Sequence, residues 1–232
     1  MELSGDTVIW RYMKLNSFLE LLSGHLVQTR IDMLYDASEG AYGWRNIRLS
    51  DALLERLSTN GKRPSVEEAI RRARRHVAAT YWFEFDRESY GMWSVYGRAG
   101  ESVAIETTVD ALRSVLERSG EAWIERMQYK PMEGEIGDVK TLFFHKRREY
   151  KEEQEIRSVQ VFEQPLEDSI VAQRLSPDDL NALMRRIILA PDSRTTFVDA
   201  ANRIVSATFA LDGKKYRGEI CRSVLDEDLI PQ

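Results

Sequence analysis

The segment ESYGMWSVYG is the feature that most constrains how this chain can fold. Its three rings, Tyr90, Trp93 and Tyr96, recur at every third position, and Gly97 follows the last of them. This spacing predicts a short helix that carries the rings on roughly one face and ends at the glycine. The apolar stretch 102–107 predicts a buried strand. A short aromatic helix that leads into such a strand would form one wall of a pocket, with Trp93 buried.

Length and composition limit the classes of protein that this chain can belong to. With 232 residues and 43% hydrophobic content, it is large enough for one sizeable domain. A net charge of −5 favours neither nucleic acid nor an anionic membrane as a partner of the whole molecule. Cys221 is the single cysteine, which suits a reducing compartment. Because no apolar run reaches transmembrane length and the N-terminus is polar, we expect a cytoplasmic protein without membrane contact.

The order of strand-forming and helix-forming segments predicts a single α+β domain over residues 1–232. We expect a central mixed or antiparallel split sheet flanked by helices, with a helical insertion at about 44–78 that the core does not need. The predicted strands are 7–12, 25–29, 78–85, 102–107, 122–129, 153–162, 187–190 and 219–225. The predicted helices are 16–22 with Asn16 as its cap, 108–118, 196–209 and two more that begin at Ser65 and Ser176.

A basic run lies on the second helix of the predicted insertion. Arg71, Arg74 and Arg75 are spaced to share one face of that helix. A solvated surface would explain such a run. The alternative is a patch that binds phosphates of a nucleic-acid or protein acceptor.

Two carboxylates on a predicted late strand are the strongest candidates for chemistry. Glu153 and Glu155 are two positions apart, so on a strand they would point to the same face, together with Arg157. Glu155 lies deeper in the strand, where its charge would be less screened, so we assign it the catalytic role. A surface strand with alternating charges is the other interpretation. The three histidines are scattered, and we expect no metal site built on them.

Several of these pieces resemble a large bacterial family known as the domain of unknown function 2971. The resemblance follows the order of the chain and covers most of it. Between Asp36 and Glu39 the family tends to have a proline and an aromatic residue, and this chain has neither. The matching segments begin with WRYM at Trp10, TR at Thr29, ESYGMWSVYG at Glu88, VAIET at Val103, HKR at His145 and EQEIR at Glu153.

The layout of the chain is also similar to that of ADP-ribosyltransferases, including toxins that modify DNA. The resemblance implies NAD as the substrate, an arginine of the first strand that holds it, aromatic rings that cradle the nicotinamide and a late-strand glutamate that serves the ribose. It assigns NAD binding to Arg11, Tyr12, Tyr90, Trp93 and Tyr96, and catalysis to Glu155. It implies no metal.

Three functions are therefore open. The first is NAD-dependent ADP-ribosyl transfer to an unidentified acceptor, as an activity in phage defence or as a toxin. The second is a non-catalytic module that binds a nucleotide, a nucleic acid or a protein. The third is a metal-dependent phosphodiesterase in which Asp36, Glu39, Glu153 and Glu155 hold Mg²⁺.

Overall fold

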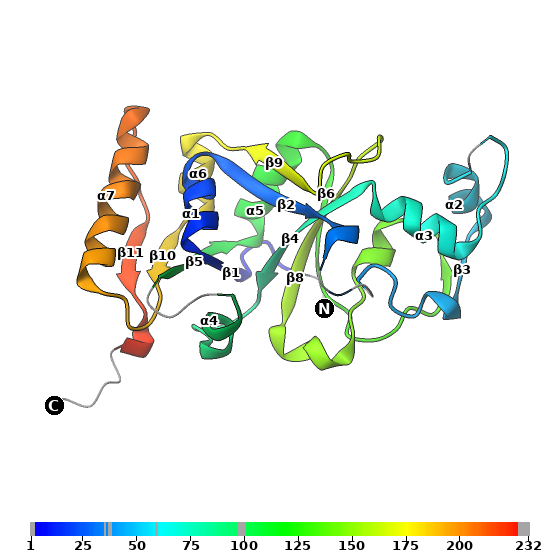
Figure 1. The fold of residues 1–232 in the computed structure, drawn as a ribbon, viewed down its shortest axis with the longest axis horizontal. Coiled ribbons are helices and arrows are strands. Elements are labelled where there is room, and N and C mark those ends of the chain that lie inside the picture. The colour runs from blue at the N-terminus through cyan, green and yellow to red at the C-terminus, as the bar shows by residue number, and fades with distance from the viewer. Residues whose placement is uncertain (1–2, 35, 37–38, 59, 97–100, 227–232) are drawn as a thin grey trace. The chain divides into compact units, whose positions relative to one another are not determined.

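The computed structural model describes residues 3–34, 36, 39–58, 60–96 and 101–226. The chain forms two compact units, and each is described by itself (Figure 1). The first unit consists of Met1–Val27, Trp82–Arg118 and Ala172–Gln232. The second consists of Gln28–Tyr81 and Ser119–Val171.

The first unit contains a mixed sheet. Strand β1 (Val8–Lys14) pairs antiparallel with β5 (Ser102–Thr108) along its whole length. On the other side of β5, β10 (Arg186–Leu189) pairs antiparallel with it, and β11 (Glu219–Arg222) then pairs parallel with β10. The β5 strand is almost wholly buried, as its apolar sequence predicts.

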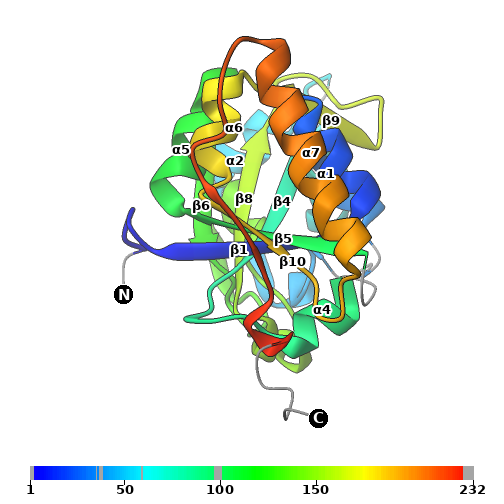
Figure 2. The same cartoon turned by 90° about the vertical axis from the view of Figure 1, so that its left-hand side faces the viewer.

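Five α-helices flank these strands, and Figure 2 shows α1, α5, α6 and α7 above β1 and β5 and α4 below them. Thr108 caps α5 by accepting the amide hydrogen of Ala111, and Ser176 forms a capping box with Asp179 at the start of α6. The predicted cap at Asn16 is wrong, because the first helix begins one residue earlier, directly after β1. The helices are α1 (Leu15–Leu22), α4 (Tyr90–Tyr96), α5 (Val109–Leu116), α6 (Pro177–Leu183) and α7 (Thr195–Leu211).

The second unit has its own strand pairings. Strand β8 (Glu155–Val161) pairs with β4 (Val77–Phe83) and, antiparallel, with β6 (Ala122–Arg126). The β4 strand also pairs antiparallel with β2 (His25–Arg30). The chain passes from one unit to the other within β2, within β4, between Arg118 and Ser119, and within β9 (Ile170–Arg174).

The segment 44–78 contributes to the core of the second unit. It contains β3 (Ile47–Leu49), α2 (Asp51–Arg56) and α3 (Val66–Arg74), and β3 pairs parallel with β7 (Gly134–Ile136). Side chains of all three elements are buried in one apolar cluster, so the expectation that the core does not need this segment is wrong. The members that it supplies to that cluster are Ile47, Leu49, Leu53, Ala69, Ile70, Ala73 and Val77.

Short 3₁₀ helices connect many of these elements. They are η1 (Ile31–Met33), η2 (Trp44–Asn46), η3 (Glu117–Ser119), η4 (Lys140–Phe143), η5 (Arg148–Glu153) and η6 (Val224–Asp226). The predicted α+β class, with a mixed sheet flanked by helices, is confirmed. The single domain over 1–232 stays a prediction. Among the described residues, no helix is both long enough and apolar enough to cross a bilayer.

Candidate active site

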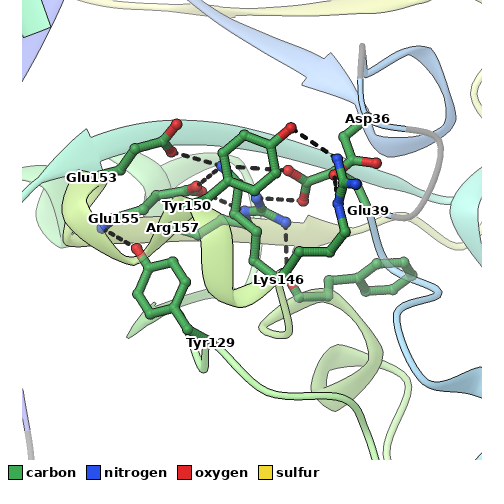
Figure 3. A network of polar contacts seen from close by, with 10 residues as sticks. Asp36, Glu39, Tyr129, Lys146, Tyr150, Glu153, Glu155 and Arg157 are labelled. Atoms are coloured by element: carbon green, nitrogen blue, oxygen red, sulfur yellow. Dashed lines mark hydrogen bonds and ion pairs between the residues drawn. The ribbon is translucent and has the colours of Figure 1, made fainter.

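Lys146 is the centre of a cluster of charged side chains in the second unit (Figure 3). Its Nζ atom lies 2.7 Å from Oε2 of Glu153, 2.8 Å from Oε2 of Glu155 and 3.5 Å from Oε1 of Glu39. The lysine, Glu39 and Glu155 are buried, whereas the side chain of Glu153 is 18% exposed. One buried ammonium therefore serves three carboxylates, and only Glu153 reaches solvent to any extent.

Arg157 is the second cation of the cluster, and it is fully buried. Its Nε atom lies 2.7 Å from Oε1 of Glu155, and its Nη2 atom lies 2.6 Å from Oε2 of Glu39. Its Nη1 atom donates to the carbonyl oxygen of Phe143 at 2.9 Å. Such bonds fix the planar guanidinium, which in turn fixes one oxygen of Glu155. The predicted sharing of one strand face by Glu155 and Arg157 is confirmed.

The backbone brings Glu153 to the same ammonium by a route that the sequence did not predict. Glu153 is not on the strand but ends the 3₁₀ helix η5, and β8 begins at Glu155. Between them Gln154 has a left-handed conformation, with φ of 46° and ψ of 46°. This turn aims both carboxylates at Lys146 even though only one of them belongs to the strand.

The pKa values of the two carboxylates are shifted in opposite directions because their environments differ. Burial alone would raise the pKa of Glu155, but the charges of Arg157 and Lys146 outweigh burial and lower that pKa below its ordinary value. Burial raises the pKa of Glu153, and its bond to Lys146 only partly opposes this. Burial acts to lower the pKa of Lys146, but Glu155 and Glu39 raise it. The pKa of Glu155 is thus lowered and that of Glu153 raised, so Glu153 takes up a proton more readily than Glu155.

Two tyrosines border the cluster. The Tyr129 hydroxyl accepts the amide hydrogen of Glu155 at 2.7 Å. The ring of Tyr150 has its centroid 4.7 Å from Nζ of Lys146, and its hydroxyl accepts a hydrogen bond from Nη2 of Arg147. Arg147 also pairs with Asp36, at 3.1 Å between Nε and Oδ2. Sequence reasoning missed the roles of Lys146 and Tyr150, and the basic run between Phe144 and Tyr150 was the signal for them.

The acids considered as Mg²⁺ ligands converge, but around cations of the protein. The Lys146 ammonium and the Arg157 guanidinium stand between Glu39, Glu153 and Glu155, in the place that a metal would need. In the described part of the chain, no group of three or more histidine, cysteine, aspartate or glutamate side chains is placed to hold a metal ion. The donor set therefore disfavours the phosphodiesterase hypothesis.

In the first unit, Tyr12 and Trp93 hold α4 against β1. Their rings meet edge to face at 4.8 Å between centroids, and each side chain is only 4% exposed. The Tyr12 hydroxyl accepts the amide hydrogen of Ser89, and Nε1 of Trp93 donates to Oε2 of Glu88. The burial predicted for Trp93 is confirmed. These contacts are those of core residues.

The other two rings of α4 are less buried. Tyr90 is 72% exposed, and Tyr96 is half-buried with its ring 5.0 Å from that of Phe83. The prediction that all three rings share one face is wrong. At 100° per residue, a spacing of three turns the side chain back by about 60° at each step, so the first and last rings are about 120° apart. The predicted helix end at Gly97 lies outside the described residues.

Arg11 lies on the opposite face of β1 from Tyr12, as the alternation of a strand requires. Its Nη2 atom donates to the carbonyl oxygen of Val27 at 3.3 Å, and its guanidinium carbon is 5.6 Å from the ring centroid of Trp82. The structure thus groups Tyr12, Trp93 and Tyr96 within one aromatic cluster and places Arg11 outside it.

The arginine side chains of α3 do not share one exposed face. Arg74 is half-buried, and its Nη2 atom is 3.5 Å from the carbonyl oxygen of Ile31. Burial lowers its pKa, opposed by the nearby carboxylates of Asp32, Glu39 and Asp36. Arg71 and Arg75 are exposed. The predicted common face of Arg71, Arg74 and Arg75 is therefore wrong, because Arg74 turns toward the acidic residues of its own unit.

Comparison with known proteins gives a resemblance of fold only. No family model matches the chain, and no curated protein matches it. Three solved structures of DarT from Thermus sp. 2.9 resemble it at 10% sequence identity: the complex with ADP-ribosylated single-stranded DNA (TM-score 0.43, 96% of this chain and 96% of that chain), the complex with carba-NAD⁺ (0.43, 94% and 96%) and the complex with NAD⁺ (0.42, 95% and 97%). The likeness spans nearly the whole chain. At this identity and TM-score it carries no argument about the site.

Proposed function

We propose that the protein cleaves NAD and transfers its ADP-ribose to an acceptor, with the carboxylate of Glu153 at the reacting ribose and Glu155 as its positioning residue. The observation that carries this proposal is the pair itself. Two carboxylates share the ammonium of Lys146, one of them buried and ionised, the other partly exposed with a raised pKa. Environments that shift the pKa values of two neighbouring carboxylates in opposite directions are typical of acid–base sites.

The chemistry needs a carboxylate beside the ribose. As the bond between C1′ of the ribose and the nicotinamide nitrogen breaks, its electron pair goes to the ring, which leaves as neutral nicotinamide. Positive charge develops on the ribose, and a nearby ionised carboxylate stabilises it. The acceptor then bonds to C1′ and gives up a proton, for which a carboxylate with a raised pKa is a suitable base.

We assign the direct contact with substrate to Glu153 and a positioning role to Glu155. The sequence argument favoured Glu155 because it lies deeper. Both of its oxygens, however, are bonded to cations, and its side chain is 1% exposed. Glu153 uses one oxygen for Lys146 and is not paired through the other with any described residue. In this assignment, Glu155 holds Lys146, and Lys146 holds Glu153.

The proposed NAD ligands fall into two groups that can be tested separately. Arg11 is the candidate partner of the pyrophosphate, because a guanidinium forms paired hydrogen bonds with phosphate oxygens. Tyr90 and Tyr96 are the candidates for stacking on the nicotinamide, and Tyr12 and Trp93 support the helix that carries them. Because Arg11 and the aromatic cluster lie on opposite faces of β1, they are alternative places for NAD, and single substitutions in each group distinguish them.

The test measures NAD binding and nicotinamide release from purified protein. We expect NAD to raise the melting temperature without added metal, since a ligand that binds only the folded state stabilises it. Release of nicotinamide should follow when DNA, RNA or a protein extract is supplied as acceptor. Stabilisation by Mg²⁺ alone would support the phosphodiesterase hypothesis, whereas NAD binding without release under any condition would support a non-catalytic binding module.

A further inference from the structure

The second unit contains a cavity of about 590 Å³ that the proposed reaction does not use. Its volume falls within the range of about 300–1,000 Å³ that is typical of small-molecule sites. Arg72 and Arg75 reach it from α3, and Arg56 reaches it from the end of α2. None of the cluster residues around Lys146 lines it.

We propose that this cavity binds the 5′-phosphate and the base of a nucleotide. The first reason is charge. Three arginines and two glutamates, Glu121 and Glu163, line the cavity, so its lining has an excess of positive charge. The side chains of Arg56 and Arg75 are exposed and make no hydrogen bond or ion pair with a described residue. The N–H groups of these two guanidinium groups can therefore donate hydrogen bonds to an anion.

The second reason is the remaining wall. Trp123 and Phe162 line the cavity together with Leu57, Val139 and Val161. An aromatic and aliphatic wall is suited to a flat base, since bases stack favourably on aromatic side chains. Inorganic phosphate would use only the arginines, and an uncharged aromatic compound only the wall. A nucleotide uses both.

Arg72 lines the cavity and also has a structural role, because its Nη1 atom donates to the carbonyl oxygen of Leu57 at 3.2 Å. It therefore joins the end of α2 to α3 and is a poor choice for mutagenesis. Arg56 and Arg75 are better targets, since their exposed side chains can be shortened without loss of packing. Arg71 offers a matched control, because it is exposed on the same helix but does not line the cavity.

The experiment compares adenosine 5′-monophosphate, adenosine, inorganic phosphate and a single-stranded oligonucleotide by calorimetry at low and high salt. We expect the monophosphate to bind more tightly than adenosine or phosphate, and more weakly as salt rises. The variant R56A/R75A should lose about tenfold or more in affinity, and Arg71→Ala should change it little. Binding of the oligonucleotide but not of the free monophosphate would place the nucleotide in a nucleic acid and would support the same site.

The inference is independent of the proposed transferase activity, and its failure is separable. Affinity for the monophosphate should persist in Arg11→Ala, the variant directed at the proposed NAD site. Loss of affinity in Arg11→Ala with full affinity in R56A/R75A would overturn the cavity as the site. Equal binding of phosphate and the monophosphate would contradict the role of the aromatic wall. Equal losses of affinity for the monophosphate in R56A/R75A and in Arg71→Ala would contradict the role of the cavity arginines.

Discussion

Glu153 and Glu155 bind the same ammonium, that of Lys146, at 2.7 and 2.8 Å, yet one is partly exposed and the other is buried. Their contributions to stability should therefore have opposite signs. Glu155 compensates two buried cations, and Glu153 is a carboxylate whose ionised form the fold disfavours. Because of this contrast, a substitution at one glutamate serves as the control for the same substitution at the other.

We expect Glu155→Gln to lower the free energy of unfolding by about 3–5 kcal/mol, as when one partner of a buried ion pair is removed. Glu153→Gln should leave it unchanged or raise it slightly, because the amide needs no ionisation. Urea unfolding at pH 7 measures both. Equal destabilisation by the two substitutions would contradict the assignment of different roles.

The pH dependence of stability follows from the directions of the two pKa values. Because the pKa of Glu155 is lowered in the fold, its stabilisation is complete above the ordinary glutamate pKa of about 4.3 and is lost as the pH falls through the folded value. The gap between wild type and Glu155→Gln should therefore narrow in acid. Because the pKa of Glu153 is raised, its penalty applies above the folded value and disappears below about pH 4.3. Unfolding measured from pH 7 down to pH 3 should show any advantage of Glu153→Gln disappear.

Two aromatic residues of α4 give a second matched pair. Trp93→Ala should cost about 3–5 kcal/mol, as expected for a buried ring. Tyr90→Ala should change stability by no more than about 0.5 kcal/mol, because its ring is 72% exposed. Thermal and chemical unfolding of both variants test this, and a large loss in Tyr90→Ala would show that its ring packs in the core.

The sequence was sufficient to predict most helices and strands but not the directions in which several side chains point. Strand and helix patterns located β5, α5 and α6, with the caps at Thr108 and Ser176, because alternation and capping are local signals. The left-handed turn at Gln154 has no glycine to signal it, and the turning away of Arg74 involves a contact with the distant Ile31. Lys146 was likewise not predicted as the centre of the cluster, since its partner Glu39 comes from a distant segment and the turn at Gln154 brings Glu153 and Glu155 to it.

Binding of NAD can be divided between its two candidate groups. Arg11→Ala should weaken NAD binding by about tenfold or more if the guanidinium meets the pyrophosphate. Tyr90→Ala should weaken it less, since an exposed ring contributes through stacking alone. Titration calorimetry with NAD, on variants whose melting temperatures match wild type, separates the two. Unchanged affinity in Arg11→Ala would remove that residue from the proposed site.

The central claim is that the Glu153 carboxylate acts on NAD, and the rate of nicotinamide release from NAD by Glu153→Gln tests it most directly. The amide keeps the shape of the side chain but can neither carry the charge nor accept the proton. We predict that turnover falls by about 10²–10⁴-fold relative to wild type, while NAD affinity and stability are retained. Full turnover in Glu153→Gln, or a wild-type protein that neither binds NAD nor releases nicotinamide with any acceptor, would contradict the account.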